Sequence, residues 1–173
     1  MSDNGHWQNS IVEYGVKPAD QFQAHPLNYR KHPQKQREAV AGSLDRVGWI
    51  APVIENRRTG NLLDGHERVW QALQNGNEGV PFVAVDVAEA DEPFVLATFD
   101  PIAAMAEMDR ALFAEVLAQV DTGNAAIQEM LAEMAAANAL FDPDSVEFPE
   151  YDESIADEVE YITCPECGHR WPK

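Results

Sequence analysis

The chain has 173 residues, 45% of them hydrophobic, a composition that allows one ordinary globular domain with appendages. No apolar run approaches the roughly 20 residues of a membrane span, and the first residues lack a signal-peptide pattern. We therefore expect a cytoplasmic protein with no membrane partner. The formal net charge of −18 is uneven: residues 1–87 contribute −1 (nine Lys and Arg against ten Asp and Glu), and residues 88–173 contribute −17 (three against twenty). A cationic surface that binds nucleic acid could therefore lie only in the first half of the chain. The alternative is that the basic residues there are ordinary solvated charges.

The first hundred residues predict a small α/β domain with a mixed sheet over residues 11–99, preceded by a flexible terminus at 1–10. A loop with two prolines is expected over 25–33, because proline excludes regular helix there. Apolar periodicity and turn signals predict four strands and two helices. The strands are expected at 11–16, 52–56, 61–64 and 81–87, and the helices from Gln34 to Gly48 and from His66 to Leu73.

Residues 100–141 predict an acidic helical extension. Asp100-Pro101 has the pattern of a helix start, with an N-cap acceptor before proline. Two apolar stripes, at 112–120 and 127–140, then indicate an antiparallel helix pair packed on itself or on the sheet.

Residues 142–162 read as an acidic linker, and residues 142–160 contain nine acidic residues and no basic one. Three interpretations stay open for this stretch: a solvated spacer, a segment that docks in a basic groove of a partner, or one that folds over the protein's own basic loop. The interleaved Phe148, Tyr151 and Ile155 favour docking over a pure spacer, since they supply apolar anchors.

The strand-to-helix turn Asp64-Gly65-His66-Glu67-Arg68 carries the strongest chemical signal. Glycine lets the backbone approach a ligand closely, and the N-terminus of the following helix attracts phosphate. His66 and Arg68 add donors that can reach phosphate oxygens. A capped turn with surface charges is the alternative.

Three blocks resemble the ParB N-terminal domain, of the ParB/sulfiredoxin-like fold: NYRKHP (28–33), LDRVGWIAPVI (44–54) and TGNLLDGHER (59–68). The resemblance is closest to phage and prophage versions, including those fused to DNA methyltransferases, and ATFDPIAAMAE (97–107) also resembles the segment that follows the domain there. It implies that Gly65, His66 and Arg68 hold the phosphates of CTP or ATP, that Arg30 faces the same pocket, and that Asp100 lies near the triphosphate or its Mg²⁺.

Departures from the family pattern narrow the activities that the fold supports. Sulfinic acid reduction requires a cysteine in the turn, where His66 stands. Glu67 replaces a basic residue, which opposes a triphosphate unless the carboxylate holds Mg²⁺ or acts as a base. No DNA-reading domain is expected in residues 100–140, because seven acidic residues and one arginine would repel phosphates. No methyltransferase motif is present either.

The tail at 163–173 contains Cys164-Pro-Glu-Cys167-Gly-His169, the form of a zinc knuckle. Cys164, Cys167 and His169 supply three of the four ligands that structural zinc needs. The fourth could come from His6, His25, His32 or a second chain, so a homodimer is one option. A vestigial knuckle with two reduced thiols is the alternative.

The leading hypothesis is a phage-type ParB-like accessory protein in the bacterial cytoplasm. It would bind a nucleotide, support a DNA transaction directly or through a partner, and recruit that protein partner through residues 100–160. One alternative is an enzyme, a ParB-like nuclease, NTPase or small-molecule phosphotransferase, with Glu67 or His66 as general base. Another is a nucleotide-free adaptor or DNA mimic.

Overall fold

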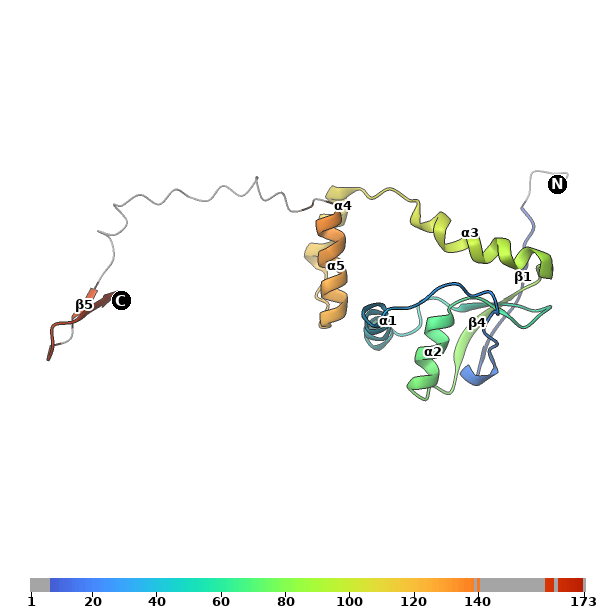
Figure 1. The fold of residues 1–173 in the computed structure, drawn as a ribbon, viewed down its shortest axis with the longest axis horizontal. Helices are drawn as coiled ribbons and strands as arrows, with labels where there is room; N and C mark the ends of the chain where they lie inside the picture. Colours follow the sequence, from blue (N-terminus) through green and yellow to red (C-terminus); the bar gives the residue numbers. More distant parts are fainter. Residues whose placement is uncertain (1–6, 139, 141–160, 164, 173) are drawn as a thin grey trace. The chain divides into compact units, whose positions relative to one another are not determined.

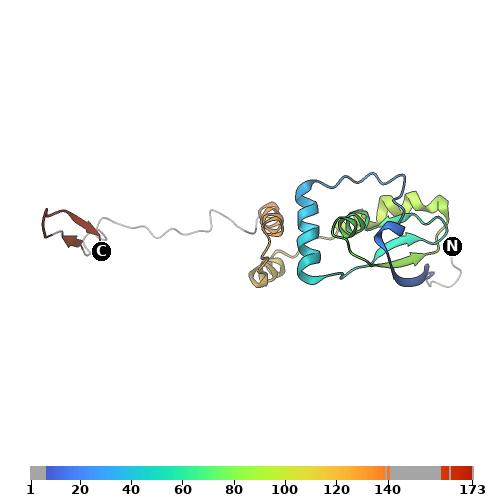
Figure 2. The same ribbon diagram turned by 90° about the horizontal axis from the view of Figure 1, so that it is seen from below.

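The computed structural model describes residues 7–138, 140, 161–163 and 165–172. These fall into two units, the first within residues 1–140 and the second within residues 141–173. The first unit contains all five described α-helices and a four-stranded sheet (Figures 1 and 2). No described helix combines the length and the apolar composition of a membrane span.

The sheet contains four strands in the spatial order β1-β4-β2-β3. They are β1 (Ile11–Lys17), β2 (Val53–Asn56), β3 (Leu62–Asp64) and β4 (Val80–Val85). The β1–β4 and β2–β3 pairs are antiparallel and the β2–β4 pair is parallel, so the sheet is mixed, as the sequence predicts. All four strands lie within two residues of their predicted bounds.

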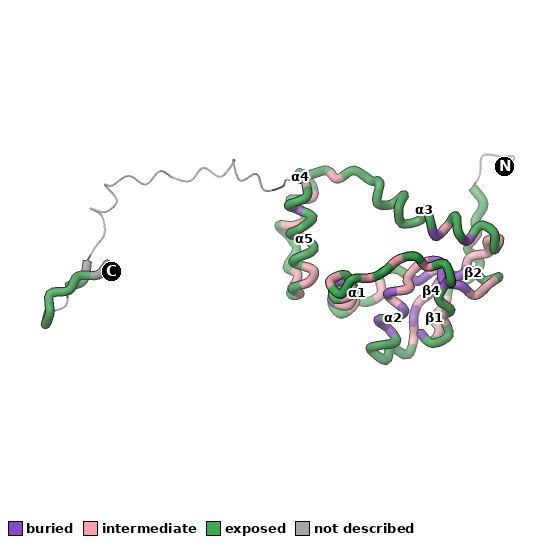
Figure 3. The backbone as a smooth tube through the Cα atoms, in the orientation of Figure 1, coloured by how far each residue is buried: buried purple, intermediate pink, exposed green. Residues whose placement is uncertain are grey.

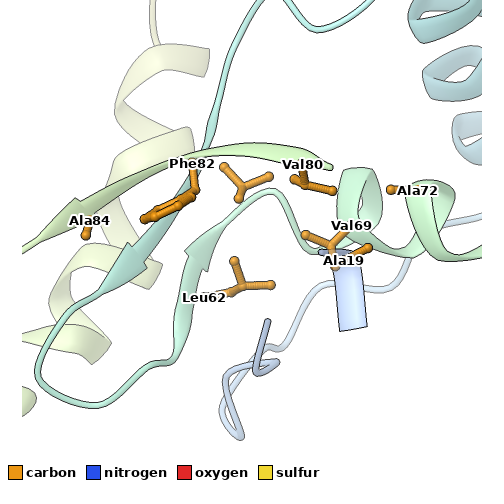
Figure 4. Close-up of a cluster of buried hydrophobic side chains, with 8 residues drawn as sticks. Ala19, Leu62, Val69, Ala72, Val80, Phe82 and Ala84 are labelled. Atoms are coloured by element: carbon orange, nitrogen blue, oxygen red, sulfur yellow. The ribbon is translucent and has the colours of Figure 1, made fainter. Parts of the chain in front are cut away.

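Alternation along the strands builds the core on one face of this sheet. Val53, Leu62 and Phe82 face this core, together with Val69 and Ala72 of helix α2 (His66–Gln74) (Figure 4). Val53, Leu62 and Ala72 are each at most 2% exposed. The burial colouring in Figure 3 shows purple segments gathered on the strands and α2. This packing fixes α2, and with it the β3–α2 turn.

Helix α3 (Glu92–Ala104) corrects the prediction of a helix start at Asp100-Pro101. The helix begins nine residues earlier, at Glu92 in place of Pro101, with Pro93 in its first turn, and Pro101 lies inside it. A proline at 101 removes one backbone N–H donor to the carbonyl four residues earlier. The helix starts at Glu92 because that side chain, 2% exposed, is bonded by groups distant in sequence.

Helices α4 (Arg110–Gln119) and α5 (Ala125–Ala137) occur where the apolar stripes predict them. α5 packs against α1 (Gln34–Val47). Lys35 lies 3.2 Å from Oε1 of Glu129 and also pairs with Glu133. Gly42 adjoins the Asn124 side chain so closely that a Cβ atom at 42 would collide with it.

The second unit contains an antiparallel hairpin of β5 (Tyr161–Thr163) and β6 (Arg170–Pro172). Gly168 in the connection has φ 72°, a conformation that favours glycine. Most of the predicted linker at 142–162, most of the predicted terminus at 1–10, and Cys164 lie outside the described residues.

Candidate functional site

The β3–α2 turn depends on the conformational freedom of glycine. Gly65 has φ 89° and ψ 18°, in the left-handed region. A Cβ atom there would lie 2.5 Å from Cγ1 and 3.2 Å from Cα of Val53, so strand β2 excludes any side chain. Among the described residues no side chain caps α2, and the N–H groups of its first turn have no intrahelical acceptor. They are therefore available to an anion.

A cleft of about 440 Å³ opens at this turn. It is lined by all six residues of the predicted nucleotide and catalytic sets: Arg30, Gly65, His66, Glu67, Arg68 and Asp100. One face of α1 also lines the cleft, with Gln36, Val40, Ser43 and Leu44. The structure thus brings together residues from a loop, a turn and the three helices α1, α2 and α3. Their roles stay predictions.

Arg30 joins the basic loop to helix α3. Its Nη2 lies 3.1 Å from Oδ2 of Asp100 and donates a hydrogen bond of 3.3 Å to the carbonyl of Leu96. The hydroxyl of Tyr29 donates to the same carbonyl at 3.2 Å. Asp100 is therefore a counter-ion of Arg30 inside a helix, and does not cap the start of one.

Arg68 connects the turn to the loop before β2. Its Nη1 donates to the carbonyls of Ala51 at 2.6 Å and Pro52 at 3.2 Å, and its Nη2 donates to Oδ2 of Asp64 at 2.6 Å. Two of its donor nitrogens are thus already used inside the protein. Arg68 shapes the wall of the cleft as well as contributing charge to it.

His66 is partly buried, which favours the neutral form of its ring. Burial lowers its pKa, and the nearby Asp64 carboxylate opposes this only in part. Its Nε2 accepts the backbone N–H of His25 at 3.2 Å. Since Nε2 is the acceptor, the neutral ring carries its proton on Nδ1 and can donate it to a ligand. The lone pair needed by a general base is already engaged, so this geometry does not favour the enzyme hypothesis.

Glu67 is 7% exposed, and both of its carboxylate oxygens have partners. Oε1 accepts from Nε2 of Gln71 at 3.0 Å, and Oε2 lies 3.6 Å from Nε of Arg37. Arg37 offsets the charge that the sequence places beside a triphosphate. A carboxylate held in this way is poorly placed to act as a base.

Sequence reasoning missed a buried polar network around Glu92. Oε1 accepts from Nδ2 of Asn56 at 2.8 Å and from the hydroxyl of Thr59. Oε2 accepts from Nδ2 of Asn61 at 3.1 Å and from Nε2 of His25 at 3.0 Å. Burial raises the pKa of Glu92, but these four hydrogen bonds together outweigh burial and lower it.

The Glu92 network positions the β3–α2 turn, because His25 is bonded to Glu92 and also to His66 of that turn. The ring of His25 bonds Glu92, and the backbone N–H of His25 bonds the ring of His66. The partners of Glu92 lie 31 to 67 residues away in sequence, so no local motif could have paired them. The one available signal is the polar pair Asn56 and Asn61 flanking a tight turn between apolar strands.

The metal predictions have no geometric support. Within the described residues no three His, Cys, Asp or Glu side chains are grouped to hold a metal ion. Cys167 is a free, exposed thiol, and Cys164 lies outside the described residues. Mg²⁺ at Glu67 or Asp100, and zinc at the tail, stay predictions.

No family model matches the chain, and no curated protein matches it. Among solved structures it is similar to the C-terminally truncated chromosome-partitioning protein ParB from Caulobacter crescentus complexed with CTP-gamma-S. The identity is 18% and the TM-score 0.48, over 62% of this chain and 61% of that one. It is also similar to a Pnob8-like ParB-N domain, with 19% identity and TM-score 0.46 over 95% of this chain and 59% of that one. It is similar as well to the C-terminally truncated Caulobacter ParB complexed to the centromeric parS site. There the identity is 14% and the TM-score 0.42, over 73% of this chain and 70% of that one.

All of these similar chains are ParB proteins or ParB N-domains. Their TM-scores are all below 0.5, and the ParB-like N-terminal domain remains what the sequence resemblance implies. This chain spans 61% of the length of the Caulobacter chain complexed with CTP-gamma-S and 59% of the Pnob8-like chain. The closer relation to phage proteins stays a prediction.

Proposed function

We propose that the cleft binds the phosphates of a nucleotide, CTP or ATP. The observation that carries the proposal is the uncapped N-terminus of α2 at Gly65, which opens on a cleft of about 440 Å³ beside Arg30 and His66. Backbone N–H groups, a guanidinium and a ring N–H are donors suited to phosphate oxygens. The volume is within the range of small-molecule sites. The sequence resemblance supplies the choice of CTP or ATP.

Binding would change the partner of Arg30. The guanidinium now pairs with Asp100, which is half exposed. A triphosphate carries more charge than one carboxylate and would compete for the guanidinium. Asp100 then has two possible roles: a counter-ion that phosphate displaces, or the Mg²⁺ ligand that the sequence predicts.

The wider role that we propose is that of a phage-type accessory protein in a DNA transaction, with residues 100–160 recruiting a protein partner. The concentration of acidic charge after residue 87 supports a basic partner surface for this half. Exposed apolar side chains on α4, with Leu112 at 59% and Val116 at 54%, supply contact area for such a partner.

The test is calorimetry with CTP, ATP and GTP, with and without Mg²⁺, on the full chain and on two variants that break the same ion pair. Arg30→Gln should abolish binding of the preferred nucleotide, because it removes a phosphate donor. Asp100→Asn should preserve or tighten binding if Asp100 is a displaced counter-ion. It should weaken binding only in the presence of Mg²⁺ if Asp100 is a metal ligand.

Thermal unfolding supplies a second readout, since a ligand that binds only the folded chain stabilises it in proportion to the logarithm of its concentration over Kd. If no nucleotide binds the full chain, or if Arg30→Gln and wild type bind equally, the proposal is wrong and the nucleotide-free adaptor remains.

A further inference from the structure

A second hollow, the Trp70 groove, lies on the domain beside the loop before α1. It has a volume of about 460 Å³, and its lining includes the apolar side chains of Phe22, Trp70 and Leu73 and the cations of Lys31 and Arg37. The groove adjoins the cleft, and the residues that line both are Asn28, Arg30, His32, His66 and Glu67. Lys31, Arg37, Trp70 and Leu73 line the groove and not the cleft.

The apolar part of the groove is only partly covered by the described residues. Trp70 is 37% exposed and Leu73 is 47% exposed, although both belong to the helix that packs on the core. Removing such surface from water is favourable, by about 25 cal/mol per Å². The groove therefore offers binding energy to an apolar side chain from outside.

The cationic part includes the partly buried guanidinium of Arg37 and the exposed ammonium of Lys31. The guanidinium of Arg37 lies 4.4 Å from the centre of the Trp70 ring, and its buried Nε has no hydrogen-bond acceptor among the described residues. The nearest carboxylate oxygen, on Glu67, is 3.6 Å from that nitrogen. Lys31 is exposed, and the described part of the chain contains no ion pair of its ammonium group.

We propose that the Trp70 groove binds an acidic peptide of a protein partner, with an aromatic or large aliphatic side chain of the peptide inserted beside Trp70 and Leu73. An apolar floor next to cationic side chains selects a ligand that combines an apolar anchor with carboxylates. The inference does not depend on nucleotide binding, because it rests on residues outside the cleft.

This chain's own residues 142–160 have the required composition, with nine carboxylates and the side chains of Phe148 and Tyr151. A labelled synthetic peptide of that sequence is therefore the probe. The receiving protein is the full chain with Phe148→Ala, Tyr151→Ala and Ile155→Ala, so that its own acidic segment lacks the apolar anchors and does not compete with the probe.

Fluorescence anisotropy should show saturable binding of the probe that weakens by about tenfold, or 1.4 kcal/mol, when Leu73→Ala or Lys31→Glu is introduced. Two matched variants serve as controls. Leu112→Ala truncates an exposed leucine on α4, and Arg57→Glu reverses an exposed charge in the β2–β3 turn. Neither residue lines the groove, so both should bind as the parent does.

A control peptide in which serine replaces Phe148, Tyr151 and Ile155 keeps the carboxylates and loses the apolar anchors. It therefore separates anchored docking from charge attraction. Binding of that peptide as tight as the probe overturns the proposal, as does equal weakening by Arg57→Glu and Lys31→Glu. Absence of binding at millimolar probe overturns it as well. Circular dichroism of each variant confirms that a lost interaction is not lost folding.

Discussion

The sheet domain and the α4–α5 region have opposite construction. In the domain, Val53, Leu62 and Ala72 are almost fully buried, and the side chains around the turn are bonded to one another. In α4 no residue is buried, and in α5 only Ala135 is. The first region can hold a site rigidly because many contacts determine each position. The second presents apolar and acidic surface that its own packing leaves open, which suits a recruiting role.

The largest expected effect is at the turn of the rigid region. Gly65→Ala should destabilise the chain by about 3 kcal/mol, because it adds left-handed backbone strain to a collision with Val53. Urea unfolding measures this against Gly76→Ala. Gly76 also has positive φ, 65°, but a Cβ atom there meets nothing within 4 Å, so about 1 kcal/mol is expected. Equal losses would contradict the idea that β2 closes the turn.

A smaller effect is expected at the buried network. Glu92→Gln should cost about 2 kcal/mol at neutral pH, because an amide cannot accept four hydrogen bonds in the same way. Since folding lowers the pKa of Glu92, its contribution is present above the ordinary value of 4.5 and is lost as pH falls below it toward the folded value.

Urea unfolding from pH 7 to pH 3 tests this directly. The difference between wild type and Glu92→Gln should shrink on acidification, whereas Glu89→Gln, an exposed neighbour, should change stability little at either pH. A difference that stays constant with pH would show that the charge of Glu92 does not stabilise the fold.

The smallest effect is expected where the two regions meet. The ion pairs of Lys35 with Glu129 and Glu133 raise the pKa of Lys35, but all three groups are partly exposed and screened by salt. Lys35→Gln should leave global stability almost unchanged and increase hydrogen exchange in α5 at low salt. Lys31→Gln is the matched control, and equal exchange in both variants would mean that Gly42 and apolar packing alone hold α5.

Much of the sheet domain could be predicted from the sequence, because its signals are local. Strand alternation, the proline-rich loop and Gly48 and Gly65 at helix ends act within a few residues. Reliance on local signals also explains the wrong helix start predicted at Asp100-Pro101. Those two residues have the local pattern of a helix N-terminus although they lie inside α3. The choice between two start sites was made by Glu92, through partners as far as 67 residues away.

In the candidate site, too, some features follow from local sequence and others only from the tertiary structure. The sequence alone determined that Gly65, His66 and Arg68 share a turn at a helix N-terminus, since a strand, a glycine and a helix in succession leave little choice of local geometry. Only the tertiary structure decided how these residues are engaged: His66 as an acceptor from His25, Arg68 as a tie to the 51–52 backbone, and Arg30 paired with Asp100. Those contacts depend on which segments the buried core and the Glu92 network bring together, and a local pattern carries no information about distant partners.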